Sequence, residues 1–213
     1  SAQLPFDTAK ALQKSGLTVD VLCGYPREYY SGPPVPDEEV IEGISIQRLH
    51  YLQPSRSHTL GRLINYFSFT LSVFLHMGRL KQYRAVLFYS NPPVLPWVAS
   101  WAKKRFGCKL VFVSYDLYPE LALRTGALKP GSSVSRLMKH INEAVYPKLD
   151  AVVALSSEMK AFLAGNRTID PKKITVIPNW YADNGEPSRD LTGNRFAREL
   201  GNKFVVSYFG NMG

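Results

Sequence analysis

The sequence predicts an α/β fold: a Rossmann-like, doubly wound and mostly parallel β-sheet with helices between its strands. Short apolar runs rich in β-branched residues alternate along the chain with amphipathic segments of helical length. Some of these runs, such as residues 110–113, are apolar at every position, which is typical of a strand buried on both faces. Glycine, proline or asparagine follows most of the runs. This order of elements indicates parallel strands joined by helical crossovers.

The N-terminal part reads as half of a strand–helix–strand unit whose first strand is absent. Residues 7–15 have a helical composition, Gly16 stands where the helix stops, and residues 19–23 form a short apolar strand. Residues 25–40 are rich in proline and glycine and predict a loop. The further strands are expected over residues 44–49, 85–89, 110–113, 150–155 and 170–177. The further helices are expected over residues 94–106, 120–124 and 132–149 and from residue 156 onward.

The end of the chain has a different character. Residues 181–202 are polar and contain three glycines, which is typical of a linker around one weak helix. Residues 204–209 form a fresh apolar run, which predicts another strand. We therefore expect a Rossmann-like domain over residues 1–185, a linker over 186–203 and the first strand of a second domain over 204–213.

Residues 60–83 form the least ordinary segment. Their core, residues 63–78, is apolar nearly all round and is flanked by arginine and lysine, but it is shorter than the roughly 18 residues that a spanning helix requires. Two interpretations stay open: a helix packed across the sheet, or a helix with one face in a membrane interface and basic residues on the headgroups. Trp97 and Trp101, at i, i+4 spacing on the next helix, are expected in the core.

Composition narrows the class of protein and its partners. The 213 residues are 45% hydrophobic and 20% charged, as in a globular protein with a real core. The net charge of +9 favours an anionic partner, which can be nucleic acid, an anionic membrane surface or a phosphorylated small molecule. The basic residues form no run with interleaved aromatics, which disfavours nucleic acid. Cys23 and Cys108 lack metal-ligand spacing and indicate buried thiols in a reducing compartment.

The candidate site residues lie where predicted strands end. Asp116 follows one strand, with Glu120 in the first turn of the next helix, and Asn179 follows another. In an open parallel sheet, ligands bind beyond the carboxyl ends of the strands, so we expect Asp116 to carry the chemistry. The alternative is that Asp116 only caps the following helix. The glycine turn over residues 210–213 would let backbone N–H groups approach a phosphate.

Several common motifs are absent from the sequence. It contains no GxGxxG after a strand, no Walker-type phosphate loop, no GxSxG elbow and no metal-ligand spacing. The dinucleotide, P-loop and hydrolase interpretations therefore lack their main support.

Three segments occur in a specific order: DLYPE (116–120), KITVIPNW (173–180) and VVSYFGNMG (205–213). They resemble the family 4 glycosyltransferases, retaining enzymes with a GT-B fold of two Rossmann-like halves. The bacterial members that build capsule, O-antigen or exopolysaccharide are the most similar. The opening AQLPFDTAKALQKSGLTVDVLCGYP is similar to that family's first helix and second strand.

This resemblance implies roles for individual residues. Asp116 lies in the family's conserved strand-end position and is the catalytic candidate, while Tyr115 stands where many members have histidine. Asp116 apart, the candidate substrate-binding residues are Ser1, Ala2, Tyr115, Glu120 and Asn179. The loop that lines the donor-phosphate site corresponds to Gly210, Asn211, Met212 and Gly213.

The resemblance also implies an activity and partners. The enzyme would be a metal-independent hexosyltransferase without cofactor, which moves a sugar from a nucleotide-sugar donor to a lipid-linked saccharide acceptor. It would be cytoplasmic and peripheral on an anionic inner membrane face, with no nucleic-acid partner. The family's other donor-binding elements belong beyond Gly213, so the chain by itself is expected to be inactive. A non-catalytic module for an anionic sugar or nucleotide, or a membrane-associated scaffold, stays open as an alternative.

One structural consequence concerns the sheet. The family's first strand, normally central, belongs upstream of Ser1, and a sheet without it has two rows of unpaired backbone groups. The strand over residues 204–209, from the same chain or from a second one, is the candidate to fill this gap.

Overall fold

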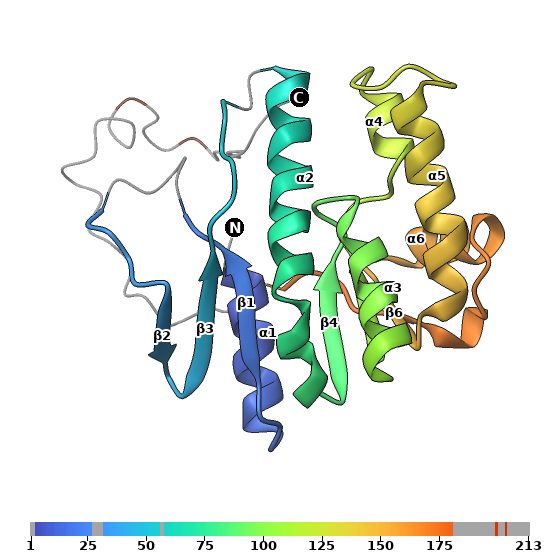
Figure 1. Ribbon diagram of the computed structural model, residues 1–213. Coiled ribbons are helices and arrows are strands. Elements are labelled where there is room, and N and C mark those ends of the chain that lie inside the picture. The colour runs from blue at the N-terminus through green and yellow to red at the C-terminus, as the bar shows by residue number, and fades with distance from the viewer. Residues whose placement is uncertain (1–2, 27–31, 56–57, 181–198, 200–202, 204–213) are drawn as a thin grey trace. The chain divides into compact units, whose positions relative to one another are not determined.

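The structure is a computed structural model that describes residues 3–26, 32–55, 58–180, 199 and 203 (Figure 1). The chain divides into two compact units, residues 1–179 and residues 180–213. The helices and strands given below belong to the first unit. The predicted linker and the predicted strand over residues 204–209 lie almost entirely outside the described residues, so the division into domains stays a prediction.

Four parallel strands form the larger sheet, in the order β4-β5-β6-β7. Leu110, Val152 and Ile174 from three of these strands are almost completely buried, as the uninterrupted apolar runs predict. The parallel arrangement confirms the predicted fold class. The strands are β4 (Ala85–Tyr89), β5 (Lys109–Ser114), β6 (Ala151–Ala154) and β7 (Ile174–Val176).

The helices of this half lie between its strands along the chain and connect them. Serine starts two of them: the side chain of Ser132 accepts the Ser135 N–H, and that of Ser156 accepts the Met159 N–H. Their bounds are α3 (Leu95–Phe106), α4 (Glu120–Arg124), α5 (Ser133–Val145) and α6 (Ser157–Asn166). Short 3-10 turns are η1 (Met77–Gln82), η2 (Tyr146–Lys148) and η3 (Pro171–Lys173).

The smaller sheet has three strands in the order β1-β3-β2. β1 (Asp20–Gly24) is parallel to β3 (Ile44–Leu49), whereas β2 (Glu38–Ile41) forms an antiparallel hairpin with β3. The predicted loop over residues 25–40 is therefore wrong for residues 38–40, which belong to β2. Pairing with β3 makes a strand of EEVI, a segment too short and too acidic for its own sequence to indicate one.

The two sheets do not pair with each other, because β1 and β4 are both edge strands. The interruption lies where the resemblance places the family's first strand. At one end the gap is bridged by Tyr83, whose hydroxyl donates a hydrogen bond to the Asp20 carboxylate. The candidate to fill the gap, residues 204–209, lies outside the described residues.

Two helices lie on opposite faces near this interruption. α1 (Gln3–Lys14) is drawn behind β1 in Figure 1, and its Ala9 packs in one cluster with Ile44 and Ile46 of β3. α2 (Thr59–Leu75) lies on the other face beside α3. Its Val73 packs in one cluster with Leu49 of β3 and Val98 of α3. α2 therefore braces the smaller sheet against the helical layer of the larger one.

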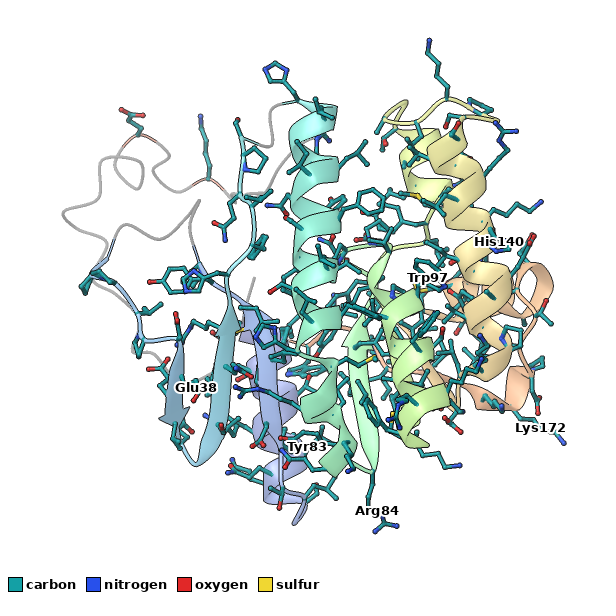
Figure 2. The ribbon with its side chains drawn as sticks, viewed as in Figure 1. Glu38, Tyr83, Arg84, Trp97, His140 and Lys172 are labelled. Carbon is teal, nitrogen blue, oxygen red and sulfur yellow. The ribbon has the colours of Figure 1, made fainter. Side chains whose placement is uncertain are left out.

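The outer side of α2 and α3 is open to solvent. The placement of Trp97 and Trp101 in the core is wrong, because each is 51% exposed. Figure 2 labels Trp97 on α3. The face that α3 buries is carried by Val98, Ala99 and Ala102 instead. The i, i+4 spacing correctly puts the two tryptophans on one face, but it does not say which face meets the sheet. Within the described ranges, no helix has the length and apolar character to cross a membrane.

Candidate functional site

A buried serine ties the ends of β4 and β5 together. Ser90 follows β4 and is 3% exposed. Its Oγ accepts hydrogen bonds from the backbone N–H groups of Tyr115, at 3.1 Å, and Asp116, at 3.0 Å. The parallel register explains this contact, because Tyr89 lies opposite Val113 and the next residues of both strands come side by side. Ser90 thus fixes the backbone that carries Asp116.

Asp116 presents a carboxyl without a fixed partner. No hydrogen bond or ion pair to this carboxylate is found among the described residues. The following helix, α4, begins at Glu120; Pro119 is its N-cap residue and no side chain caps it, so the interpretation of Asp116 as a helix cap is wrong. Burial raises the pKa of Asp116, because an apolar environment disfavours the charged form. This carboxyl is therefore available to a bound hydroxyl group, as an acceptor or as a proton carrier.

Asp116 stands between two tyrosines along the chain, Tyr115 and Tyr118. The ring of Tyr115 stacks on that of Tyr89, with centroids 5.2 Å apart and planes 19° from parallel. Burial, followed by the charges of Tyr66 and Asp116, raises the pKa of Tyr118 to about 12. The phenol of Tyr118 therefore stays neutral at physiological pH and can donate a hydrogen bond. Flat apolar faces, hydroxyls and one carboxylate form a suitable surface for a polyhydroxylated ring.

Glu120 has a partner of its own. Its Oε2 accepts a hydrogen bond from Arg167 Nη2 at 2.6 Å, and the Arg167 side chain is only 10% exposed. The guanidinium also lies over the rings of Tyr146, at 5.6 Å, and Phe162, at 5.5 Å. This ion pair joins α4 to the residue that follows α6. The proposed contact of Glu120 with substrate stays a prediction, and the structure adds a structural role.

The same arginine helps to hold the loop between β5 and α4. The Tyr118 carbonyl accepts hydrogen bonds from Asn142 Nδ2 at 2.7 Å and from Arg167 Nη2 at 3.2 Å. With Ser90 at its start, the loop over residues 115–119 is anchored from β4, α5 and the end of α6. A carboxylate on such a loop is held in one position before any ligand arrives.

Asn179 lies at the same edge of the sheet as Asp116. It follows β7, and β5, β6 and β7 are parallel, so their carboxyl ends point the same way. Two strand spacings separate the tips of β5 and β7, which corresponds to about 10 Å. Asn179 is exposed. The other candidates, Ser1, Ala2 and residues 210–213, lie outside the described residues, and their roles stay predictions.

A second polar cluster lies on the smaller sheet. His50 Nε2 is 2.8 Å from Asp37 Oδ1, and the ring of Tyr25 stacks on His50 at 4.5 Å. His50 and Asp37 border a hollow of ≈ 520 Å³ that also reaches His76, the C-cap residue of α2. The His50 and Asp37 side chains are mostly exposed. The Asp37 carboxylate therefore already has a partner, His50, and lacks the burial of Asp116.

Sequence reasoning found Asp116 and Tyr115 but missed Ser90, Tyr118 and Tyr66 as parts of the same site. Tyr118 stands within the DLYPE segment and could have been noted there. Ser90 could have been found from the parallel register, since it ends the neighbouring strand. Tyr66 comes from α2, and only tertiary packing brings it near Tyr118.

Comparison with known families decides the class of this domain. Residues 6–180 match the model of the "Glycosyl transferase 4-like domain". The chain belongs to this family. The match spans both sheets and contains Tyr115, Asp116, Glu120 and Asn179, so the predicted family is confirmed.

Relatives of this glycosyl transferase 4-like domain support the same conclusion. "Probable glycosyltransferase WbjE" of Pseudomonas aeruginosa is 26% identical over 160 residues, which cover 74% of this chain and 39% of WbjE. The chain thus spans about two fifths of the length of this curated relative.

Solved structures are similar to the glycosyl transferase 4-like domain at low identity. A sucrose-phosphate synthase structure from Thermosynechococcus elongatus has a TM-score of 0.53 and 15% identity, with 81% of each chain covered. HepE of Anabaena, solved with UDP-glucose, has a TM-score of 0.47 and 18% identity, covering 74% of this chain and 36% of HepE. The first of these likenesses shows the fold alone, which is one Rossmann-like half of a GT-B protein.

Proposed function

We propose that this domain is the acceptor-binding half of a retaining glycosyltransferase. The enzyme transfers a sugar from a nucleotide-sugar donor to a lipid-linked saccharide, in the synthesis of a bacterial surface polysaccharide such as capsule or O-antigen. Membership of the glycosyl transferase 4-like family supports the reaction class. The observation that carries the proposal is Asp116, a carboxyl without a partner among the described residues, held at the carboxyl edge of the sheet.

The proposed role of Asp116 is to orient the acceptor hydroxyl. Its carboxylate accepts a hydrogen bond from the hydroxyl whose oxygen bonds to the anomeric carbon of the donor sugar. Ser90 and the anchored loop keep this oxygen in place, and such prior positioning lowers the barrier of a two-substrate reaction. The stacked rings of Tyr89 and Tyr115 offer an apolar face to the acceptor sugar.

Departure of the nucleoside diphosphate develops negative charge on phosphate oxygens. Backbone N–H groups of the glycine turn over residues 210–213 are the proposed donors to these oxygens on this chain. Protein cations and N–H groups suffice for this charge, so the proposal includes neither a metal nor a cofactor. Asn179 and Glu120 are proposed to contact the sugars from the same strand edge.

A lipid-linked acceptor also implies where the enzyme acts. A lipid-linked saccharide is reached from the cytoplasm only by a protein that approaches the inner membrane face, where anionic headgroups attract basic proteins. The net charge of +9 supports such an approach. We therefore propose a cytoplasmic enzyme that is peripheral on this membrane.

The test compares two carboxyl clusters in the longest natural form of the protein. Asp116→Asn keeps the size of the side chain but removes its charge, and we expect sugar transfer to fall by about 100-fold or more, in the range of a lost general base. Asp37→Asn, at the exposed His50 cluster, is the matched control and should leave transfer within about twofold. A panel of nucleotide sugars with membrane extract as acceptor supplies the assay. Equal activity of both variants and the parent would refute the assignment to Asp116.

A further inference from the structure

The most unusual surface of the described residues is the outer side of α2 and α3. Along α2, the exposed large apolar side chains are Leu60, Ile64, Phe67, Leu71, Phe74 and Leu75. Their spacing of three and four residues places them in one stripe along the helix. From first to last, 15 residues at 1.5 Å each give the stripe a length of about 22 Å. We name this stripe, together with Trp97 and Trp101 of α3, the α2–α3 face.

This face extends over two neighbouring helices. Phe74 of α2 and Trp101 of α3 meet edge to face, with ring centroids 6.3 Å apart. Trp97 lies one turn before Trp101, and Figure 2 shows it on α3. A single partner helix covers a stripe on one helix, whereas here two neighbouring helices present apolar rings together. A broad apolar partner fits this shape better than a narrow one.

α2 also buries its inner side. Asn65, Thr70 and Val73 of this helix are buried, and Val73 packs against Leu49 and Val98. A helix that is apolar all round is normally surrounded by protein or lipid. Among the described residues α2 packs against protein on its inner side, and its outer side lacks the apolar surroundings that its composition indicates.

The segment of the chain that carries this face has a large excess of positive charge. Between Glu42 and Asp116 the sequence contains no acidic residue and ten basic ones: Arg48, Arg56, Arg62, Arg79, Lys81, Arg84, Lys103, Lys104, Arg105 and Lys109. Four of them are paired with acids from elsewhere: Arg48 with Glu39, Arg79 with Glu38 at 3.1 Å, Lys103 with Asp150 at 2.6 Å and Lys109 with Asp150 at 3.4 Å. The exposed residues Lys104 and Arg105 end α3, and Arg84 precedes β4 at the lower edge of the larger sheet in Figure 2. No ion pair to Lys104, Arg105 or Arg84 is found within the described ranges.

We infer that the α2–α3 face docks on an anionic lipid bilayer. The apolar stripe of α2 lies along the interface, Trp97 and Trp101 occupy the headgroup level, and the basic residues at the foot of α2 and α3 pair with lipid phosphates. The inference deepens the proposed function and rests on it for the presence of a membrane. The charges also favour a bilayer over a second copy of the chain, since two such faces would bring basic residues of like sign together.

Vesicle binding by the full chain tests the inference directly. Parent protein is floated with vesicles of phosphatidylcholine alone and of phosphatidylcholine with 30% phosphatidylglycerol. We expect Trp97→Ser with Trp101→Ser, and separately Phe67→Ser with Leu71→Ser, to weaken binding to the anionic vesicles about tenfold or more. The matched control is Leu17→Ser with Val40→Ser, two exposed apolar residues on other elements, which should bind as the parent does.

The charge component has its own pair of variants. Lys104→Glu with Arg105→Glu should weaken binding to anionic vesicles by about 25-fold or more, at about fivefold for each basic residue lost. Lys14→Glu with Lys172→Glu makes the same change of charge on α1 and η3 and should have a smaller effect. In a Trp180→Phe background, the emission of Trp97 and Trp101 should shift to the blue and be quenched by brominated lipid.

The possible results separate the two proposals. Vesicle binding without sugar transfer would leave the docking inference standing while the proposed function falls. Transfer to a soluble acceptor without vesicle binding would overturn the docking inference alone. Serine variants that bind vesicles as the parent does, or that instead abolish a dimer in sedimentation velocity, would also overturn it.

Discussion

The four-stranded and the three-stranded sheet of this domain differ in how much apolar side chain they bury. β4–β7 and their helices enclose a large cluster that includes Leu110, Leu149 and Val152, each with no measurable exposure. The small sheet has Ala9, Ile44 and Ile46 as its buried cluster with α1. Asp116 and its anchors belong to the large half. The catalytic candidate is thus built on the better-packed half, although among the described residues each half has an edge strand at the gap, β4 or β1.

The largest expected effect is on the core of the large half. Leu110→Ala should lower the free energy of unfolding by about 2–5 kcal/mol, because it leaves a cavity among fully buried neighbours. Ile46→Ala, in the small half, should cost less because that cluster is small and closer to solvent. Urea denaturation followed by circular dichroism measures both. An equal loss for the two variants would contradict the comparison.

The ion pair of the large half gives the next effect. Glu120→Gln should cost about 1–2 kcal/mol, since it leaves the nearly buried guanidinium of Arg167 without its counter-charge. The Glu120 side chain is 30% exposed, which keeps the loss below that of a fully buried pair. Thermal melting checks this value. Asp170→Asn, at the start of the exposed η3 turn, serves as a control. Its free energy of unfolding should stay within about 0.5 kcal/mol of that of the parent.

Hydrogen exchange sharpens the comparison strand by strand. Backbone amides of β5 and β6, which have a strand on each side, should be protected about tenfold or more above those of β1. β4 is an edge strand like β1, but its amides should fall between the two sets because β4 packs on the larger buried cluster. Uniform protection across both sheets would show that the gap between β1 and β4 is closed in solution.

The smallest effect concerns the pH dependence of stability. Burial raises the pKa of Asp116 in the folded state above that in the unfolded state. Between these two pKa values the folded state binds more protons, so this group makes the domain less stable as pH rises through that window. Asp116→Asn should remove the decrease and give equal or higher stability at neutral pH, although we expect it to lower sugar transfer. Denaturation of both proteins between pH 3 and about 7 tests this; a variant that is less stable at neutral pH would contradict it.

Much of the fold could be predicted from the sequence. The strands β4 to β7 are visible in the sequence as short apolar runs, and α5 and α6 begin at serine caps. β2 could not be predicted, because EEVI becomes a strand only by pairing with β3. The exposure of Trp97 was missed because periodicity defines a face without saying what covers it.

The site was predictable only in part, for a related reason. A strand tip followed by aspartate is visible in the sequence, and the parallel topology places Asp116 and Asn179 at one edge. The contacts that shape the site join residues far apart, such as Glu120 and Arg167 or Tyr118 and Asn142. No local pattern reports such pairs, so they emerge only once the helices are packed.

The anchoring of the loop over residues 115–119 has a consequence for how acceptor preference can evolve. Its backbone is tied to Ser90, Asn142 and Arg167, so its path cannot be remodelled without undoing several bonds at once. Tyr66, which α2 places near Tyr118, has no hydrogen bond to the backbone of this loop among the described residues. We therefore expect changes in acceptor preference to arise from substitutions on α2, while the loop over residues 115–119 stays the same.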